Sequence, residues 1–190
     1  MPLRAKSYFK DYEYEETIDK NGKVKRRYIY KGDYFERDLS DKGRNAERYL
    51  ELFFSALGIA LSVSAMSADT PANYWGFFSM VSILNLIPIF CAFIGAVVSF
   101  FKKGNLTRGD HEDRLILLKV MPITATVLLV VLAAGYIEDI ADGYISYFPL
   151  AMTAGAAVVF AVISIHEIKT RYIVRSGSEL SQEEKDNEEK

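Results

Sequence analysis

Four long stretches of this chain contain no charged side chain. They cover residues 52–68, 70–101, 120–137 and 143–165, and they are 17, 32, 18 and 23 residues long. A helix rises about 1.5 Å per residue, so about 20 apolar residues cross the ~30 Å hydrocarbon core of a bilayer. A soluble fold of 190 residues would have too little polar chain to cover four such helices. The sequence therefore predicts an all-α membrane protein built on a four-helix transmembrane bundle.

The bundle should occupy residues 40–166. We place the spans at about residues 49–68, 76–101, 119–137 and 145–166. Short connections favour an antiparallel up-down order, with the first span beside the second and the third beside the fourth. Helices in lipid associate along faces of small residues. Such residues recur every three or four positions in three spans: Ser55, Gly58, Ser62 and Ala65; Ala92, Gly95 and Ser99; and Ala154, Ala157, Ala161 and Ser164.

Lysine and arginine are distributed unevenly around these stretches. Residues 1–48 contain 13 of the 23, residues 102–119 contain five, and the chain after residue 166 contains five. The two other connections, at residue 69 and at 138–142, contain none. Basic residues beside membrane spans stay in the cytoplasm. We therefore expect both termini and residues 102–119 to be cytoplasmic and the two acidic loops to be outside. The compact size and the lack of glycosylation sequons in the outer loops fit the plasma membrane of a bacterium, its inner membrane.

The N-terminal segment, residues 1–39, contains the signal of a small cytoplasmic β-hairpin at about residues 12–31. Asn21-Gly22 favours a type I′ turn, because both central residues of that turn need a positive φ. If these two residues form the whole loop, Glu16 faces Arg27. Acidic residues of the first strand then lie opposite basic residues of the second, which stabilises the pairing.

An isolated two-stranded hairpin is marginally stable in water, so this one needs a support. The same two-residue loop would pair Tyr14 with Ile29. The support could be the membrane surface, the 102–119 linker, a second copy of the chain or another protein. Basic and aromatic residues occur together in KVKRRYIYK, and the position beside a bilayer and the opposing acidic strand favour anionic lipid or a protein over nucleic acid. The candidate contact residues are Lys25, Arg26, Arg27, Tyr28, Tyr30 and Lys31.

Polar residues inside the second and third spans are candidates for a function within the membrane. Asn85 is the most polar of them, and its amide should bond across helices or to the carbonyl groups that Pro88 frees. We interpret it as a structural contact, with a substrate contact as the alternative. Pro122 is expected in the first turn of the third span. The candidate mid-membrane polar contacts are Ser82, Asn85, Thr124 and Thr126.

Ionisable residues at the cytoplasmic ends of the spans are expected to reach water. Glu51 lies in the first apolar turn, near the headgroups, where it can pair with Arg48 or Arg44. His166 and Glu167 end the fourth span, where a histidine usually extends to the interface.

The linker motif RGDHEDR groups four potential metal ligands: Asp110, His111, Glu112 and Asp113. Four adjacent residues cannot all face one ion on a helix or a strand. We therefore interpret the motif as a solvated loop that caps the third span, and we predict no metal site from it.

No motif of a catalytic or cofactor site is present, so the sequence predicts no catalytic residue, no cofactor and no metal. The single cysteine, Cys91, lies within the second span and is interpreted as a packing residue. Residues 167–190 form an acidic cytoplasmic tail that we expect to be largely disordered.

These observations favour a non-enzymatic accessory or scaffolding subunit that docks a partner through its cytoplasmic hairpin and linker. Its expected partners are membrane lipids and another protein or a second copy of the chain, and no nucleic acid is expected. The alternative is a small oligomeric transporter or channel that uses the mid-membrane polar residues. A membrane enzyme is a third hypothesis, for which only the linker carboxylates and His111 are available.

Overall fold

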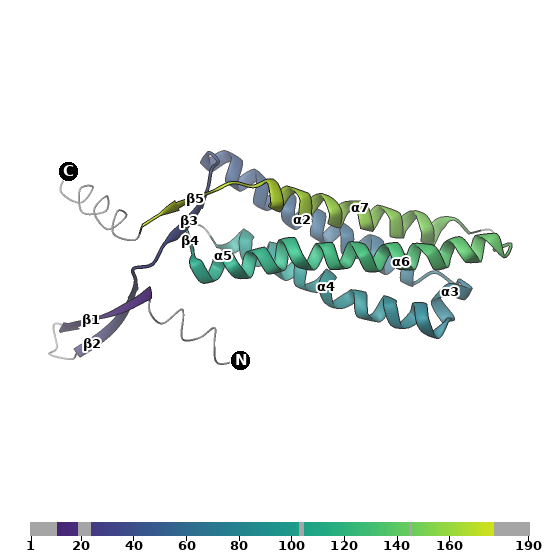
Figure 1. The fold of residues 1–190 in the computed structure, drawn as a ribbon, viewed down its shortest axis with the longest axis horizontal. Coiled ribbons are helices and arrows are strands. Elements are labelled where there is room, and N and C mark those ends of the chain that lie inside the picture. Colours follow the sequence, from purple (N-terminus) through teal and green to yellow (C-terminus); the bar gives the residue numbers. More distant parts are fainter. Residues whose placement is uncertain (1–10, 19–23, 103–104, 145, 177–190) are drawn as a thin grey trace. The chain divides into compact units, whose positions relative to one another are not determined.

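A computed structural model of the protein describes residues 11–18, 24–102, 105–144 and 146–176. The chain divides into two compact units, which are described separately (Figure 1). The helical unit is formed by Leu39–Lys103 and Asp113–Thr170. The β unit takes its described residues from Met1–Asp38, Gly104–Glu112 and Arg171–Lys190.

The helical unit contains four helices that are long and apolar enough to cross a membrane. The bounds of its helices are Asp41–Met66 (α2), Pro71–Tyr74 (α3), Gly76–Phe101 (α4), Met121–Ala141 (α6) and Phe148–Lys169 (α7). Helix α2 begins at the N-cap Ser40, whose Oγ accepts a hydrogen bond from the Gly43 N–H at 3.3 Å. This arrangement is typical of a multi-pass membrane protein.

The four long helices form a closed ring of neighbours. The predicted pairs α2–α4 and α6–α7 pack together, and α2–α7 and α4–α6 complete the ring. Side chains such as Phe160, Ile89 and Leu129 fill the interior and are almost fully buried. Glycine allows the closest helix contacts, because a Cβ on Gly58 would lie 2.6 Å from Phe160 and one on Gly135 would lie 2.9 Å from Phe78.

The predicted small-residue faces are partly correct. The faces on α2 and α4 are buried. The face predicted on α7 is only partly correct: Ser164 is buried, but Ala154 is exposed and Ala157 and Ala161 are half-buried. Helix α7 buries a neighbouring face instead, and its most buried residues are Thr153, Ala156, Phe160, Ile163, Ser164 and Glu167.

The linker before the third span is helical, which corrects the expected loop. Helix α5 (Arg108–Leu115) continues through a π-helical turn, η2 (Ile116–Val120), into α6. The Met121 N–H donates to the Ile116 carbonyl, five residues back. A proline lacks an N–H and crowds the carbonyl four residues before it, and a wider π turn relieves such a defect. Pro122 lies in the first turn of α6, as predicted, and the π turn joins that helix to α5.

The expected acidic loop at residues 138–142 is also mostly helical, because α6 extends to Ala141. Asp139 Oδ2 accepts a hydrogen bond from the Ala72 N–H of α3 at 2.9 Å. The Tyr136 hydroxyl donates to Asn73 Oδ1 at 2.7 Å, and the Tyr144 hydroxyl donates to the Asp69 carbonyl at 2.5 Å. These bonds join the α2–α4 connection to the α6–α7 connection.

The β unit contains two small sheets. The predicted hairpin is formed by β1 (Tyr12–Ile18) and β2 (Val24–Tyr30), which pair antiparallel. A second sheet that the sequence analysis did not predict places β3 (Tyr34–Arg37) between β4 (Leu106–Thr107) and β5 (Tyr172–Arg175). Strand β5 lies in the segment that was expected to be a largely disordered tail.

The predicted hairpin register is wrong by one residue. Glu16 pairs with Arg26 rather than Arg27, and Tyr14 pairs with Tyr28 rather than Ile29. The described part of the ladder ends at Ile18 and Val24, and its register is not the one that a two-residue Asn-Gly loop produces. Residues 19–23 lie outside the described part of the chain. In this register Glu15 is the backbone partner of Arg27 and Glu16 is the partner of Arg26.

We predict that Gly58→Ala destabilises the helical unit. The new methyl group would overlap the ring of Phe160, and overpacking of this kind lowers the free energy of unfolding by about 1–3 kcal/mol. Thermal unfolding of the detergent-solubilised protein measures the change. Gly155→Ala is the matched control at the same α2–α7 interface, because its Cβ would meet Leu61 at an ordinary 3.4 Å. Equal melting temperatures for the two variants would contradict the close α2–α7 contact.

Candidate functional site

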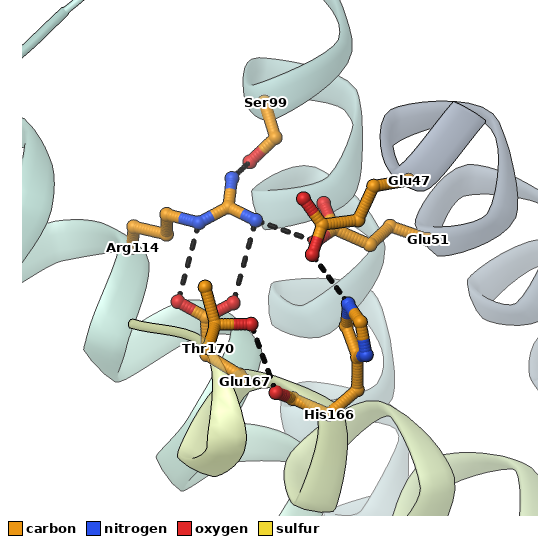
Figure 2. Close-up of polar contacts among 7 residues, drawn as sticks. All are labelled: Glu47, Glu51, Ser99, Arg114, His166, Glu167 and Thr170. Carbon is orange, nitrogen blue, oxygen red and sulfur yellow. Dashed lines mark hydrogen bonds and ion pairs between the residues drawn. The ribbon is translucent and has the colours of Figure 1, made fainter. Parts of the chain in front are cut away.

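Charged side chains meet inside the helical unit, at the end where α2 begins and α7 ends. We call this group the Arg114 cluster, and Figure 2 shows it. Its six members come from four helices: Glu47 and Glu51 from α2, Ser99 from α4, Arg114 from α5, and His166 and Glu167 from α7.

Local structure positions each member of the cluster. Glu47 and Glu51 are four residues apart, so they lie on one face of α2. Arg114 lies in the last turn of α5, just before the π-helical turn. His166 and Glu167 lie in the last turn of α7, where the Thr170 hydroxyl donates to the His166 carbonyl at 2.9 Å.

Arg114 makes the central contacts. Its Nη2 donates to Glu51 Oε1 at 2.5 Å, and its Nε and Nη2 donate to the two carboxylate oxygens of Glu167 at 3.2 and 3.4 Å. Its Nη1 donates to Ser99 Oγ. The planar guanidinium thereby uses all three nitrogens, and the contact with Glu167 is bidentate, which is the stronger form of such a pair.

The central ion pairs are deeply buried. The side chains of Arg114, Glu51 and Glu167 are 7%, 5% and 1% exposed. Charges in a low-dielectric interior are tolerated when they are paired and hydrogen-bonded, and removal of one partner leaves the other as a buried charge. Arg114 therefore makes the ends of α2, α4 and α7 dependent on one another.

A second pair lies beside Arg114 and is open to solvent. His166 Nε2 lies 2.5 Å from Glu47 Oε1, and the two side chains are 50% and 7% exposed. Glu47, Glu51 and His166 each offer one metal-ligand atom, and these atoms lie within 4.8 Å of one another. The group therefore combines two carboxylates and one imidazole at a partly open position.

The sequence analysis did not predict that the residues of the Arg114 cluster lie together. Glu51 was expected near the headgroups with Arg48 or Arg44, but it is buried against Arg114. Arg48 instead donates to Asn45 Oδ1 at 3.4 Å. Arg114 was assigned to a solvated loop. The i,i+4 spacing of Glu47 and Glu51, together with an arginine before the third span, was the available signal.

The four predicted mid-membrane polar residues lie in different environments. Ser82 and Asn85 are buried in the helical unit, whereas Thr124 is exposed and Thr126 is half-buried. The two threonine hydroxyls donate to carbonyls of their own helix, at Val120 and Pro122. Within the described part of the chain neither amide atom of Asn85 has a hydrogen-bond partner, so the expected bonds across helices or to the Pro88 region are not formed.

The linker residues are separated by the helix that they form. Thr107 and Asp110 exchange hydrogen bonds between side chain and backbone at the start of α5. Glu112 pairs with Arg108 at 3.4 Å. His111 stacks on the Phe35 ring at 4.3 Å and meets the Tyr172 ring edge-on at 4.4 Å. His111 thus packs between aromatic rings of the second sheet.

The predicted contact residues of the hairpin lie on β2 or directly after it. Tyr28 is exposed and Tyr30 is half-buried. Lys31 Nζ lies 2.5 Å from Glu13 Oε2, and both side chains are exposed. The structure describes only the backbone of Lys25, Arg26 and Arg27.

Comparison with known proteins gives no relative from which to transfer a function. No protein-family model, curated protein or solved structure matches the chain. The functional argument therefore depends on the residues and geometry described above.

We predict that Arg114→Met lowers the free energy of unfolding by about 3–5 kcal/mol, because Glu51 and Glu167 would remain buried without the guanidinium. Chemical unfolding in detergent, followed by circular dichroism, measures this change. Arg108→Met is the matched control on the same helix, since its pair with Glu112 is exposed and contributes less than about 1 kcal/mol. Similar losses in the two variants would show that the cluster does not stabilise the bundle.

Proposed function

We propose that this protein is a non-enzymatic accessory or scaffolding subunit of a plasma membrane, whose β unit docks a partner protein in the cytoplasm. One observation carries the proposal. The hairpin gathers its tyrosines on a single face that is largely exposed.

The observed register creates this face. Tyr12 pairs with Tyr30 and Tyr14 pairs with Tyr28, and directly opposed residues of an antiparallel pair lie on the same side. Alternate residues of a strand also share a side, so all four tyrosines lie together. Glu13 falls on the other face, where it pairs with Lys31.

The base of this tyrosine face is anchored within the β unit. The Tyr30 hydroxyl donates to the Asp33 carbonyl at 3.0 Å and accepts from the Arg108 N–H at 3.1 Å. The rings of Tyr12 and Tyr34 both meet the Tyr30 ring edge-on at 5.1 Å. Burial raises the pKa of the Tyr30 hydroxyl above its ordinary value, so it remains protonated and can donate. Residues of the 102–119 linker thus provide part of the support that the hairpin needs.

The far end of the face is open, because Tyr14 and Tyr28 are 63% and 70% exposed. Tyrosine is enriched among the residues that dominate protein–protein binding energies. The charges of the hairpin favour a protein over anionic lipid: β1 contains three acidic residues and β2 three basic residues, so the two strands together are neutral. Attraction to an anionic bilayer needs an excess of basic residues.

The partner that fits this face presents an apolar pocket for the rings of Tyr14 and Tyr28. The transporter alternative has less support from the geometry, because Thr124 faces away from the interior that holds Asn85. The proposed membrane orientation, with both termini and the β unit in the cytoplasm, is supported by the lysine and arginine distribution.

The orientation predicts which connections a membrane-impermeant thiol reagent reaches in intact cells. In a Cys91→Ser background, Asp142→Cys should react in intact cells, whereas Arg171→Cys should react only after the membrane is permeabilised. Both positions are exposed, and they follow the ends of α6 and α7. The reverse pattern would invert the proposed topology.

We predict that a photoreactive amino acid at Tyr28 cross-links one partner protein in living cells. Tyr14→Ser should reduce the yield of that adduct about tenfold, because truncation of a central tyrosine contact removes on the order of 1–2 kcal/mol. Mass spectrometry should recover the same partner from a probe at Tyr14. A probe at Glu13, on the other face, is the matched control. Adducts with lipid alone, adducts with a second copy of the chain, or the absence of any adduct would each overturn the proposal.

A further inference from the structure

Glu47, Glu51 and His166 have the chemistry of a metal-binding group. Two carboxylate oxygens and one imidazole nitrogen converge, with all three ligand atoms within 4.8 Å of one another. Such mixed oxygen and nitrogen sets bind first-row transition ions, including Zn²⁺ and Mn²⁺. We propose that these three residues bind a divalent first-row transition-metal ion at the end of the helical bundle.

The spacing of the ligand atoms is close to what an ion requires. A metal about 2.0–2.2 Å from each ligand keeps neighbouring ligand atoms about 3–3.5 Å apart. Glu47 and His166 are already in contact at 2.5 Å and would separate slightly. The third ligand, the Glu51 carboxylate, would approach the other two by up to about 1–2 Å, a shift that a side-chain rotation provides.

Arg114 holds Glu51 in position for this role. Figure 2 shows that Arg114 and His166 reach the two glutamates from different directions. Arg114 binds Oε1 of Glu51 and is itself fixed by Glu167 and Ser99. Carboxylates that bind metals are usually oriented by such outer hydrogen bonds, whose loss weakens metal binding about 10–100-fold.

Charge and access are consistent with a cation at this position. The Arg114 cluster contains three carboxylates and one guanidinium, and a divalent ion adds positive charge next to two of the carboxylates. The His166 side chain is half-exposed, so an ion can enter from the end of the bundle. Water can occupy the remaining coordination positions, as in sites with three protein ligands.

Zn²⁺ binding to the full-length protein tests the inference. All proteins contain Cys91→Ser, and metal is removed with a chelator before calorimetric titration in detergent. We expect one Zn²⁺ per chain. His166→Gln and Glu47→Gln should each weaken binding more than about 100-fold, and Ser99→Ala about tenfold. His111→Gln removes the only other histidine of the chain and should leave binding unchanged.

Pulsed electron paramagnetic resonance provides a second measurement if the ligand variants do not fold. In Mn²⁺-loaded His111→Gln protein, the ion should couple to one imidazole nitrogen, and the signal should change when histidine is labelled with ¹⁵N. Absence of this coupling would overturn the proposal. So would a Cys91→Ser protein that binds no ion, or Zn²⁺ binding that His166→Gln leaves intact.

Discussion

The buried guanidinium of Arg114 is the contact on which the arrangement of the helical unit depends. It bonds to side chains of α2, α4 and α7, so three helices meet one planar group with a fixed fork of donors. Apolar packing alone tolerates small shifts between helices, whereas a buried ion pair does not, because a displaced carboxylate loses its partner in a low-dielectric interior. The cluster therefore specifies which faces of these helices point inward at this end of the bundle.

The helices themselves could be predicted because the bilayer sets a minimum apolar length. The uncharged stretches of the sequence coincide with all four long helices, because a helix that crosses hydrocarbon needs about 20 apolar residues in succession. The inward faces were harder to predict. On α2 the small residues lie on the buried face. On α7 alanines occur on several sides of the helix, so the spacing of Ala154 and Ala157 did not identify the buried face, which contains Thr153 and Ala156.

The candidate site was missed for a local reason. Residues 108–114 are so polar that they resemble a loop, yet they form the start of a helix that continues past Pro122 through a π turn. That continuity brings Arg114 into the interior, and hydropathy contains no signal for it. The hairpin shows a related limit. Asn21-Gly22 predicted a hairpin, but the register of a hairpin also depends on the length of its loop, which the sequence did not give. In the observed register Tyr14 lies opposite Tyr28.

The hydrogen bonds around α3 restrict how the helices can slide. Asp139 of α6 accepts a hydrogen bond from the Ala72 N–H, and Tyr136 of the same helix donates one to Asn73. The Arg114 cluster is at the opposite end of α2 and α6, so the helical pairs α2–α4 and α6–α7 are fastened to each other near both ends. A piston-like displacement of one pair along the other would break polar contacts at the two ends together. Motions that bow the middle of the helices would leave both sets of bonds in place.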